Sequence, residues 1–337
     1  MARDKGKLQI YAEYFVARAA LGTLGVFPLA WSMKIGEMIS IVPFKLAKRL
    51  RFVGFRNLEL ALPELSRTEH EEILRGTFES LGRQLGIFSH LAHLSAEKVR
   101  DIIEVEGIGH CQSANAENHG KFIFTAHFGG WELSHLAMAA RGFPMNVVAR
   151  KIDNPLLDSF VERMRTALGS RTIDKSSSAR TMFRLLQNEE IIGILVDLNT
   201  QEHEGVFVDF FGLSSSTTTG LAKLALRTGA TVLPGFAVWQ KEKKRYVLKI
   251  CEPIEIPEGK DAEENIKVLT QRVTAKIEEF VRAYPDQWMW IHKRWNTQPP
   301  DAPNLYAKDT DVASLKSKVQ SQKSEIKSNR KFEVSEL

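Results

Sequence analysis

The segment Lys121-Phe122-Ile123-Phe124-Thr125-Ala126, followed at once by His127-Phe128-Gly129-Gly130-Trp131-Glu132, decides how this chain is organised. Its first half is an apolar run typical of a buried strand, and residues 133–140 continue as a helix. His127 therefore follows the carboxyl end of a strand, and Glu132 comes five residues later. On a continuous helix that offset would put the two side chains on different faces, but the glycine pair allows a turn that brings them together. A histidine held by a carboxylate predicts a general base; the alternative is a core histidine beside an acid that stabilises a helix start.

Strand-like and helical segments alternate through the second half of the chain. This pattern predicts the α/β class, with a mainly parallel central sheet flanked by helices. The expected strands are 122–126, 145–149, 191–196, 232–238 and 246–256, and the expected helices are 66–94, 133–140, 154–168, 178–188, 219–227 and 262–284.

The composition restricts the class of partner. The chain has 337 residues with a formal net charge of +5, which favours an anionic membrane, a nucleic acid or an acidic carrier protein. Nucleic acid is the weakest of the three, because no zinc finger, glycine-rich phosphate loop or aromatic and basic RNA motif is present. Two cysteines provide neither a disulfide framework nor a zinc pattern, and Glu132-x-x-His135 with His127 does not make the His-Glu-x-x-His zinc pattern, so we expect no metal. We expect no cofactor either.

The first 50 residues are predicted to form a helical segment that associates with a membrane. Residues 10–46 are largely apolar, but the longest uncharged run, residues 19–33, is shorter than the roughly 20 residues that a membrane span needs. Basic residues follow at Lys45, Lys48, Arg49 and Arg51, which favours a segment lying in the interface of an anionic membrane. The alternative is an amphipathic helix packed on the protein's own core. We expect three parts: this segment (1–50), a catalytic domain (51–300) and a flexible polar tail (301–337).

Polar residues follow three of the expected strands: His127, Arg150 and Asp197. In open α/β sheets, ligands bind beyond the carboxyl ends of the strands, so these side chains are predicted to share one edge. Basic residues are concentrated between the second and third of them, where they could bind phosphates or carboxylates or form a solvated helix face: Arg163, Arg165, Arg171, Lys175, Arg180 and Arg184.

Four blocks in one order resemble the bacterial lipid A late acyltransferases, the lauroyl/myristoyl transferase family, within the lysophospholipid and glycerolipid acyltransferases. The blocks are the run from His127 to Glu132, the run from Val148 to Leu156 with its Arg and Asn-Pro, the run from Phe207 to Gly212 followed by Thr217 to Gly220, and the C-terminal signature from Tyr284 to Trp295, which contains Trp-x-His-x-Arg-Trp. The resemblance covers roughly residues 51–300. The chain departs from it at Asp197-Leu198-Asn199, where the family often has Asp-Gln-Asp, so only Asp197 is carried over.

The resemblance implies transfer of a fatty acyl group from acyl carrier protein, or acyl-CoA, to a hydroxyl of a lipid A precursor or related glycolipid. His127 would be the general base and Glu132 would hold its ring. Arg150, Asn154, Arg163, Asp197, Phe211 and Gly212 are expected to bind substrate. Arg150 and backbone N–H groups near Gly129 and Gly130 are the candidate oxyanion donors. The implied location is the cytoplasmic face of the inner membrane. The alternatives are another lipid acceptor, such as a lysophospholipid, an aminolipid or a phosphatidylinositol mannoside; thioester hydrolysis; or a non-catalytic lipid-binding protein.

Overall fold

A seven-stranded sheet forms the centre of the computed structural model, which describes residues 6–91, 94–113, 120–174, 178–259, 261–300 and 302–307. The strand order is β1-β9-β8-β2-β5-β3-β4, and only the β8–β9 pairing is antiparallel. The bounds are β1 (Ile103–Glu106), β2 (Lys121–Thr125), β3 (Met145–Ala149), β4 (Arg171–Asp174), β5 (Ile191–Leu195), β8 (Thr231–Gln240) and β9 (Arg245–Ile250). The predicted α/β class and mainly parallel sheet are therefore confirmed.

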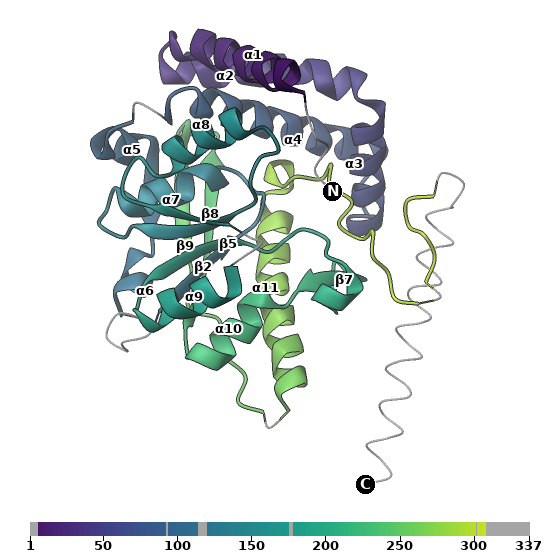
Figure 1. Ribbon diagram of the computed structural model, residues 1–337. Coiled ribbons are helices and arrows are strands. Elements are labelled where there is room, and N and C mark those ends of the chain that lie inside the picture. Colours follow the sequence, from purple (N-terminus) through teal and green to yellow (C-terminus); the bar gives the residue numbers. More distant parts are fainter. Residues whose placement is uncertain are drawn as a thin grey trace.

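Helices cover both faces of this sheet (Figure 1). One face packs against α7 (Trp131–Ala139) and α8 (Pro155–Arg165), and the other packs against α9 (Ser178–Gln187), α10 (Gly220–Thr228) and α11 (Ala262–Ala283). Strand β2 lies in the middle, and all five of its residues are buried. A strand covered on both faces needs apolar side chains in both directions, which explains the three successive apolar residues at its centre, Phe122, Ile123 and Phe124.

The remaining helices lie before or between these elements. They are α1 (Lys7–Gly25), α2 (Leu29–Leu46), α3 (Lys48–Ala61), α4 (Arg67–Phe88), α5 (Ala96–Ile102), α6 (Ile108–Ser113) and the 3₁₀ turns η4 (Glu202–Glu204) and η5 (Pro285–Gln287). Helix α4 begins with the capping box that the sequence predicted, in which Ser66 and Glu69 exchange hydrogen bonds.

Glycines allow α2 and α4 to approach closely. A Cβ on Gly36 would overlap the carbonyl oxygen of Gly82, and one on Gly82 would overlap the carbonyl oxygen of Gly36. Gly86, one turn further along α4, faces the backbone of Ser32 and Met33 in the same way. These contacts attach α2 directly to α4, and Figure 1 shows α1 and α2 lying together across α4.

The N-terminal segment is helical, as predicted, and carries a concentration of exposed apolar side chains. No helix in the described ranges is long and apolar enough to cross a membrane. The exposed apolar residues of α1, α2 and the turn between them, called the apolar face below, are Leu8, Tyr11, Phe15, Val16, Val26, Phe27, Trp31, Met38, Ile39, Val42 and Leu46.

A two-stranded hairpin, which the sequence did not predict, follows η4. Strands β6 (Gly205–Phe210) and β7 (Leu213–Thr218) pair antiparallel around a tight turn in which both Phe211 and Gly212 have positive φ, 56° and 75°. A turn with two positive φ values matches the twist of a hairpin. The turn residues therefore have a structural reason for their identity, apart from any contact with substrate.

The predicted part boundaries need two corrections. Residue 50 falls inside α3, so the expected division cuts a helix. The expected tail from residue 301 begins with packed structure, since Leu305 and Tyr306 are buried and the Tyr306 hydroxyl donates to Oδ1 of Asn57 at 2.6 Å. Residues 308–337 lie outside the described residues.

Candidate active site

His127 and Asp197 meet at the carboxyl edge of the sheet, because their strands β2 and β5 are neighbours in parallel register. Nδ1 of His127 lies 2.9 Å from Oδ1 of Asp197, and the His127 backbone N–H donates to Oδ2 at 2.9 Å. The Asp197 side chain is almost fully buried, whereas that of His127 is 22% exposed. With Nδ1 bonded to Asp197, Nε2 is the nitrogen that can accept a proton.

The C-terminal signature completes the surroundings of Asp197. Trp288 Nε1 donates to Oδ2 of Asp197 at 2.9 Å, and the backbone N–H of Met289 donates to the His127 carbonyl at 3.0 Å. Asp197 therefore accepts three hydrogen bonds, from the ring and backbone of His127 and from Trp288. Such an arrangement fixes both the position and the tautomer of the imidazole.

The charges of this pair support each other. Burial alone would lower the pKa of His127, but the charge and hydrogen bond of Asp197 raise it above the ordinary value. Burial would raise the pKa of Asp197, yet the charge of His127 and the hydrogen bonds lower it to about 2. Asp197 is thus an anion at every physiological pH, and it stabilises the protonated form of His127.

Glu132 does not hold the His127 ring; it binds Arg165. Both Arg165 Nε and an Arg165 Nη donate to the Glu132 carboxylate, at 3.1 and 2.5 Å. Burial would raise the pKa of Glu132, but the hydrogen bonds and charge of Arg165 lower it below the usual range. The predicted ring-holding role of Glu132 is therefore wrong in this geometry, because Asp197 occupies Nδ1 and Glu132 already has a bidentate cationic partner.

His135 is buried beside Glu132 and Arg165. Its Nε2 lies 3.2 Å from the Arg165 carbonyl oxygen. Burial lowers the pKa of His135 to about 4, so the ring is neutral at pH 7 and donates its proton to that carbonyl.

The two glycine N–H groups are used inside the protein. Gly129 N–H donates to the Gln287 carbonyl at 2.9 Å, and Gly130 N–H donates to the Ala237 carbonyl at 2.8 Å. Gly129 has a φ of 51°, and the glycine pair contacts Ala237 and Tyr246 so closely that side chains would not fit. These two N–H groups are therefore already occupied, and an oxyanion donor among the other backbone N–H groups near them stays a prediction.

A second polar region lies next to Arg165. A cavity of about 240 Å³ lies between α8 and the ends of β3 and β4 and includes Arg150, Lys151, Arg165, Asp158, Glu162 and Asp174 in its lining. Arg150 is strongly exposed and pairs with Asp153 at 3.2 Å. Since Arg165 both lines this cavity and binds Glu132, it connects the cavity to the His127 segment.

The other predicted substrate residues have different surroundings. Asn154 is buried, caps α8 through Leu156 N–H, and donates to the Ile10 carbonyl and Glu13, so it attaches α1 to α8. Arg163 lies exposed in the last turn of α8. Phe211 packs against Trp290 and Trp295. Substrate contact by Arg150, Asn154, Arg163, Phe211 and Gly212 stays a prediction.

Sequence reasoning missed two residues of the site. Trp288 lies in the C-terminal signature, but its position along the chain does not indicate that it reaches Asp197. Arg165 is one of six basic residues between residues 163 and 184, and the sequence does not distinguish it from the other five. Arg165 lies on α8, next to Glu132 in the first turn of α7. That the two helices are neighbours follows from the strand order, which the sequence pattern does not give.

Comparison with known proteins places the chain in a family. Residues 3–297 match the family described as bacterial lipid A biosynthesis acyltransferase. The chain is 27% identical over 305 residues to the lipid A biosynthesis lauroyltransferase of Escherichia coli K12, covering 88% of this chain and 96% of that protein. It is 24% identical over 300 residues to a lipid A biosynthesis acyltransferase of Haemophilus influenzae, covering 83% and 92%.

A solved structure gives a weaker likeness. It is the 1-acyl-sn-glycerophosphate acyltransferase PlsC of Thermotoga maritima, with a TM-score of 0.31, 15% identity, and coverage of 70% of this chain and 98% of that chain. The match across residues 3–297, which includes the His127 segment and the Trp288 signature, is decisive: the chain belongs to the bacterial lipid A biosynthesis acyltransferase family and is an acyltransferase.

Proposed function

We propose that this protein transfers a fatty acyl group from a thioester of acyl carrier protein, or of coenzyme A, to a hydroxyl of a lipid A precursor or a related glycolipid. The observation that carries the proposal is the hydrogen bond of 2.9 Å between His127 and a buried, ionised Asp197. Relatives named for lipid A acyl transfer support the choice of acceptor.

The chemistry follows from the protonation state of the pair. Neutral His127 carries its proton on Nδ1, towards Asp197, and Nε2 takes the proton of the acceptor hydroxyl as its oxygen bonds to the thioester carbonyl carbon. Asp197 stabilises the imidazolium that forms. When the tetrahedral intermediate collapses, the carbon–sulfur bond breaks and the departing thiolate takes the proton back from Nε2. No covalent acyl-enzyme is needed, so no nucleophilic Ser or Cys is required.

The cavity beside Arg165 is a suitable place for the polar part of the acceptor. Its lining is polar, with three basic side chains, Arg150, Lys151 and Arg165, beside three acidic ones, and the basic groups could bind the oxygens of a phosphorylated sugar. Arg165 then binds Glu132 on one side and faces the acceptor on the other. In this proposal Glu132 acts on the reaction through Arg165, whereas Asp197 acts through His127.

The location proposed is the cytoplasmic face of the inner membrane. The apolar face lacks a partner of its own among the residues that the structure describes, and the neighbouring side chains of Lys45, Lys48 and Arg49 are exposed. Apolar side chains flanked by exposed cations suit the interface of an anionic bilayer.

The experiment is an assay of purified full-length protein with acyl carrier protein and coenzyme A thioesters, offered separately with a lipid A precursor. We expect a mass gain of one acyl group on the lipid, detected by mass spectrometry. Release of free fatty acid at the same rate without acceptor would indicate a hydrolase. Acylation of a lysophospholipid but not of the glycolipid would indicate a different acceptor.

A further inference from the structure

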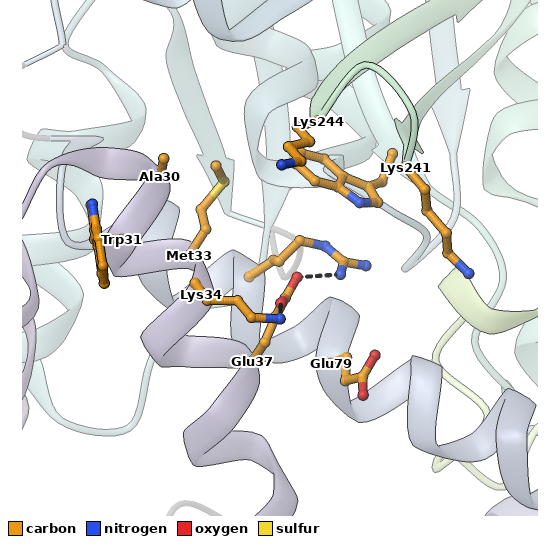
Figure 2. A pocket seen from close by; sticks show the side chains of 10 residues that line it. Ala30, Trp31, Met33, Lys34, Glu37, Glu79, Lys241 and Lys244 are labelled. Atoms are coloured by element: carbon orange, nitrogen blue, oxygen red, sulfur yellow. Dashed lines mark hydrogen bonds and ion pairs between the residues drawn. The ribbon is translucent and has the colours of Figure 1, made fainter.

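One cavity lies away from the His127 pair. It has a volume of about 520 Å³ and lies between α2, α4 and the β8–β9 turn. Neither His127 nor Asp197 lines it, and neither Glu132 nor Arg165 does. Figure 2 shows Trp31, Met33, Lys34 and Glu37 of α2 along one side, and Lys241 and Lys244 of the β8–β9 turn across from them.

Two kinds of side chain make up its wall. Trp31, Met33 and Trp239 provide aromatic and thioether surface. Four basic side chains accompany them, Lys34, Arg83, Lys241 and Lys244, against two acidic ones, Glu37 and Glu79. The lining thus combines apolar surface with an excess of positive charge, which is the complement of an amphiphile with an anionic head.

The buried member of the basic group is held firmly. The Arg83 side chain is 6% exposed and donates to Glu37 at 2.7 Å, the interaction drawn as a dashed line in Figure 2. Its guanidinium lies over the Trp239 ring, 5.0 Å from the ring centroid. Lys34 also pairs with Glu37, at 3.0 Å, so the Glu37 carboxylate forms ion pairs with both Lys34 and Arg83. Lys241 and Lys244 stand on a turn at the rim of the cavity, where Lys241 also pairs with Asp286 at 2.8 Å.

The cavity is continuous with the apolar face of α2. Trp31 belongs to both, since it lines the cavity and is 65% exposed. Met38 and Val42, about two and three turns further along α2, extend the exposed apolar surface from there. A molecule whose acyl chains contact the apolar face could therefore place its head group among Lys34, Lys241 and Lys244.

We propose that this cavity binds the phosphate head group of an anionic membrane lipid, with the upper part of the lipid's acyl chains against Trp31 and Met33. This lipid is neither the donor nor the acceptor of the proposed reaction. An acidic protein partner would also be attracted by the basic turn, but it would leave the apolar wall formed by Trp31 and Met33 without a function. The lipid accounts for both kinds of lining residue.

Isothermal titration of the full-length enzyme in nonionic detergent tests this proposal. The ligands are dihexanoyl phosphatidylglycerol and dihexanoyl phosphatidylcholine, below the concentration at which they form micelles. We expect the anionic lipid to bind more tightly. The double variant Lys241→Gln/Lys244→Gln should weaken its binding by about fivefold for each lysine removed. Trp31→Ala should weaken the binding of both lipids, because it removes apolar contact rather than charge.

The control is Lys98→Gln/Lys223→Gln, which removes two exposed lysines of α5 and α10 and should leave binding unchanged. Equal affinity for the two lipids would overturn the proposal, as would equal binding by the control and the cavity variant. A third titration uses acyl carrier protein: if the cavity variant loses affinity for that protein and keeps its affinity for phosphatidylglycerol, the site is a protein-docking site instead. The readout is lipid binding, so it does not depend on the proposed acyl transfer.

Discussion

Nδ1 of His127 lies 2.9 Å from Oδ1 of Asp197, although 70 positions separate the two residues along the chain. The same carboxylate accepts the His127 backbone N–H and the Trp288 indole N–H through its other oxygen. Asp197 can therefore set the ring orientation, the tautomer and the pKa of His127 at once.

Asp197→Asn should lower kcat by roughly 10²–10⁴-fold while the protein stays folded. The amide would offer only one oxygen for three donors, and its NH₂ group would favour the tautomer in which Nε2 carries the proton and is no longer a base. Initial rates with thioester donor and lipid acceptor, at matched circular dichroism, measure this. A variant with the wild-type rate would show that Asp197 has no role in positioning the base.

Glu132→Gln should reduce stability as well as activity. It leaves the Arg165 guanidinium, whose side chain is 18% exposed, with an uncharged partner, and breaking a mostly buried ion pair costs on the order of 3 kcal/mol. Denaturant unfolding measures the free energy. Lys34→Gln, which removes a pair with an exposed member, is the matched control and should cost less than about 1 kcal/mol. If Glu132→Gln unfolds at the wild-type midpoint, the pair with Arg165 does not stabilise the fold.

Gly36→Ala should loosen the contact between α2 and α4, because the added Cβ would overlap the Gly82 backbone. Overpacking of this kind costs about 1–3 kcal/mol. Gly22→Ala in α1 has open space around its Cβ and should be neutral or slightly stabilising, since alanine favours a helix. Thermal unfolding of the two variants compares them; equal midpoints would contradict the close packing of α2 on α4.

The apolar face should bind membranes. Deleting residues 1–50 would also remove the α2 surface packed on α4, so point variants are the sharper test. Phe15→Ser/Val42→Ser should float less with anionic liposomes than the wild type, because two exposed apolar side chains are replaced. Ile152→Ser, which changes an exposed apolar residue outside the N-terminal helices, is the control. Equal flotation of all three proteins would assign membrane binding to another surface.

The predictable part of the fold was the part with apolar runs. Strands β2, β5 and β8 are covered by helices on both faces and read as strands from their residues alone. The missed strands are short or polar: β4 begins with an exposed arginine, and β7 is made largely of Ser and Thr. Their pairing depends on neighbours in space that a local pattern does not contain.

The site was predictable in position but not in pairing. The expectation that His127 and Asp197 share one edge is confirmed, because both follow parallel strands. Asp197 reaches the His127 ring because β2 and β5 are adjacent in the sheet. The order of the strands along the chain does not show that adjacency. Proximity in sequence therefore favours Glu132 as the partner of the ring, whereas in the structure Glu132 binds Arg165.

The most direct measurement of the central claim is the pH dependence of kcat/KM for the wild type, together with the rate of His127→Ala. A base must be neutral to act, and Asp197 raises the pKa of His127, so activity should rise with pH through an apparent pKa above about 6.5. His127→Ala should lose about 10²–10⁴-fold and its rate should no longer follow that titration. A folded His127→Ala variant with near-wild-type turnover, or with the same pH profile, would contradict the account.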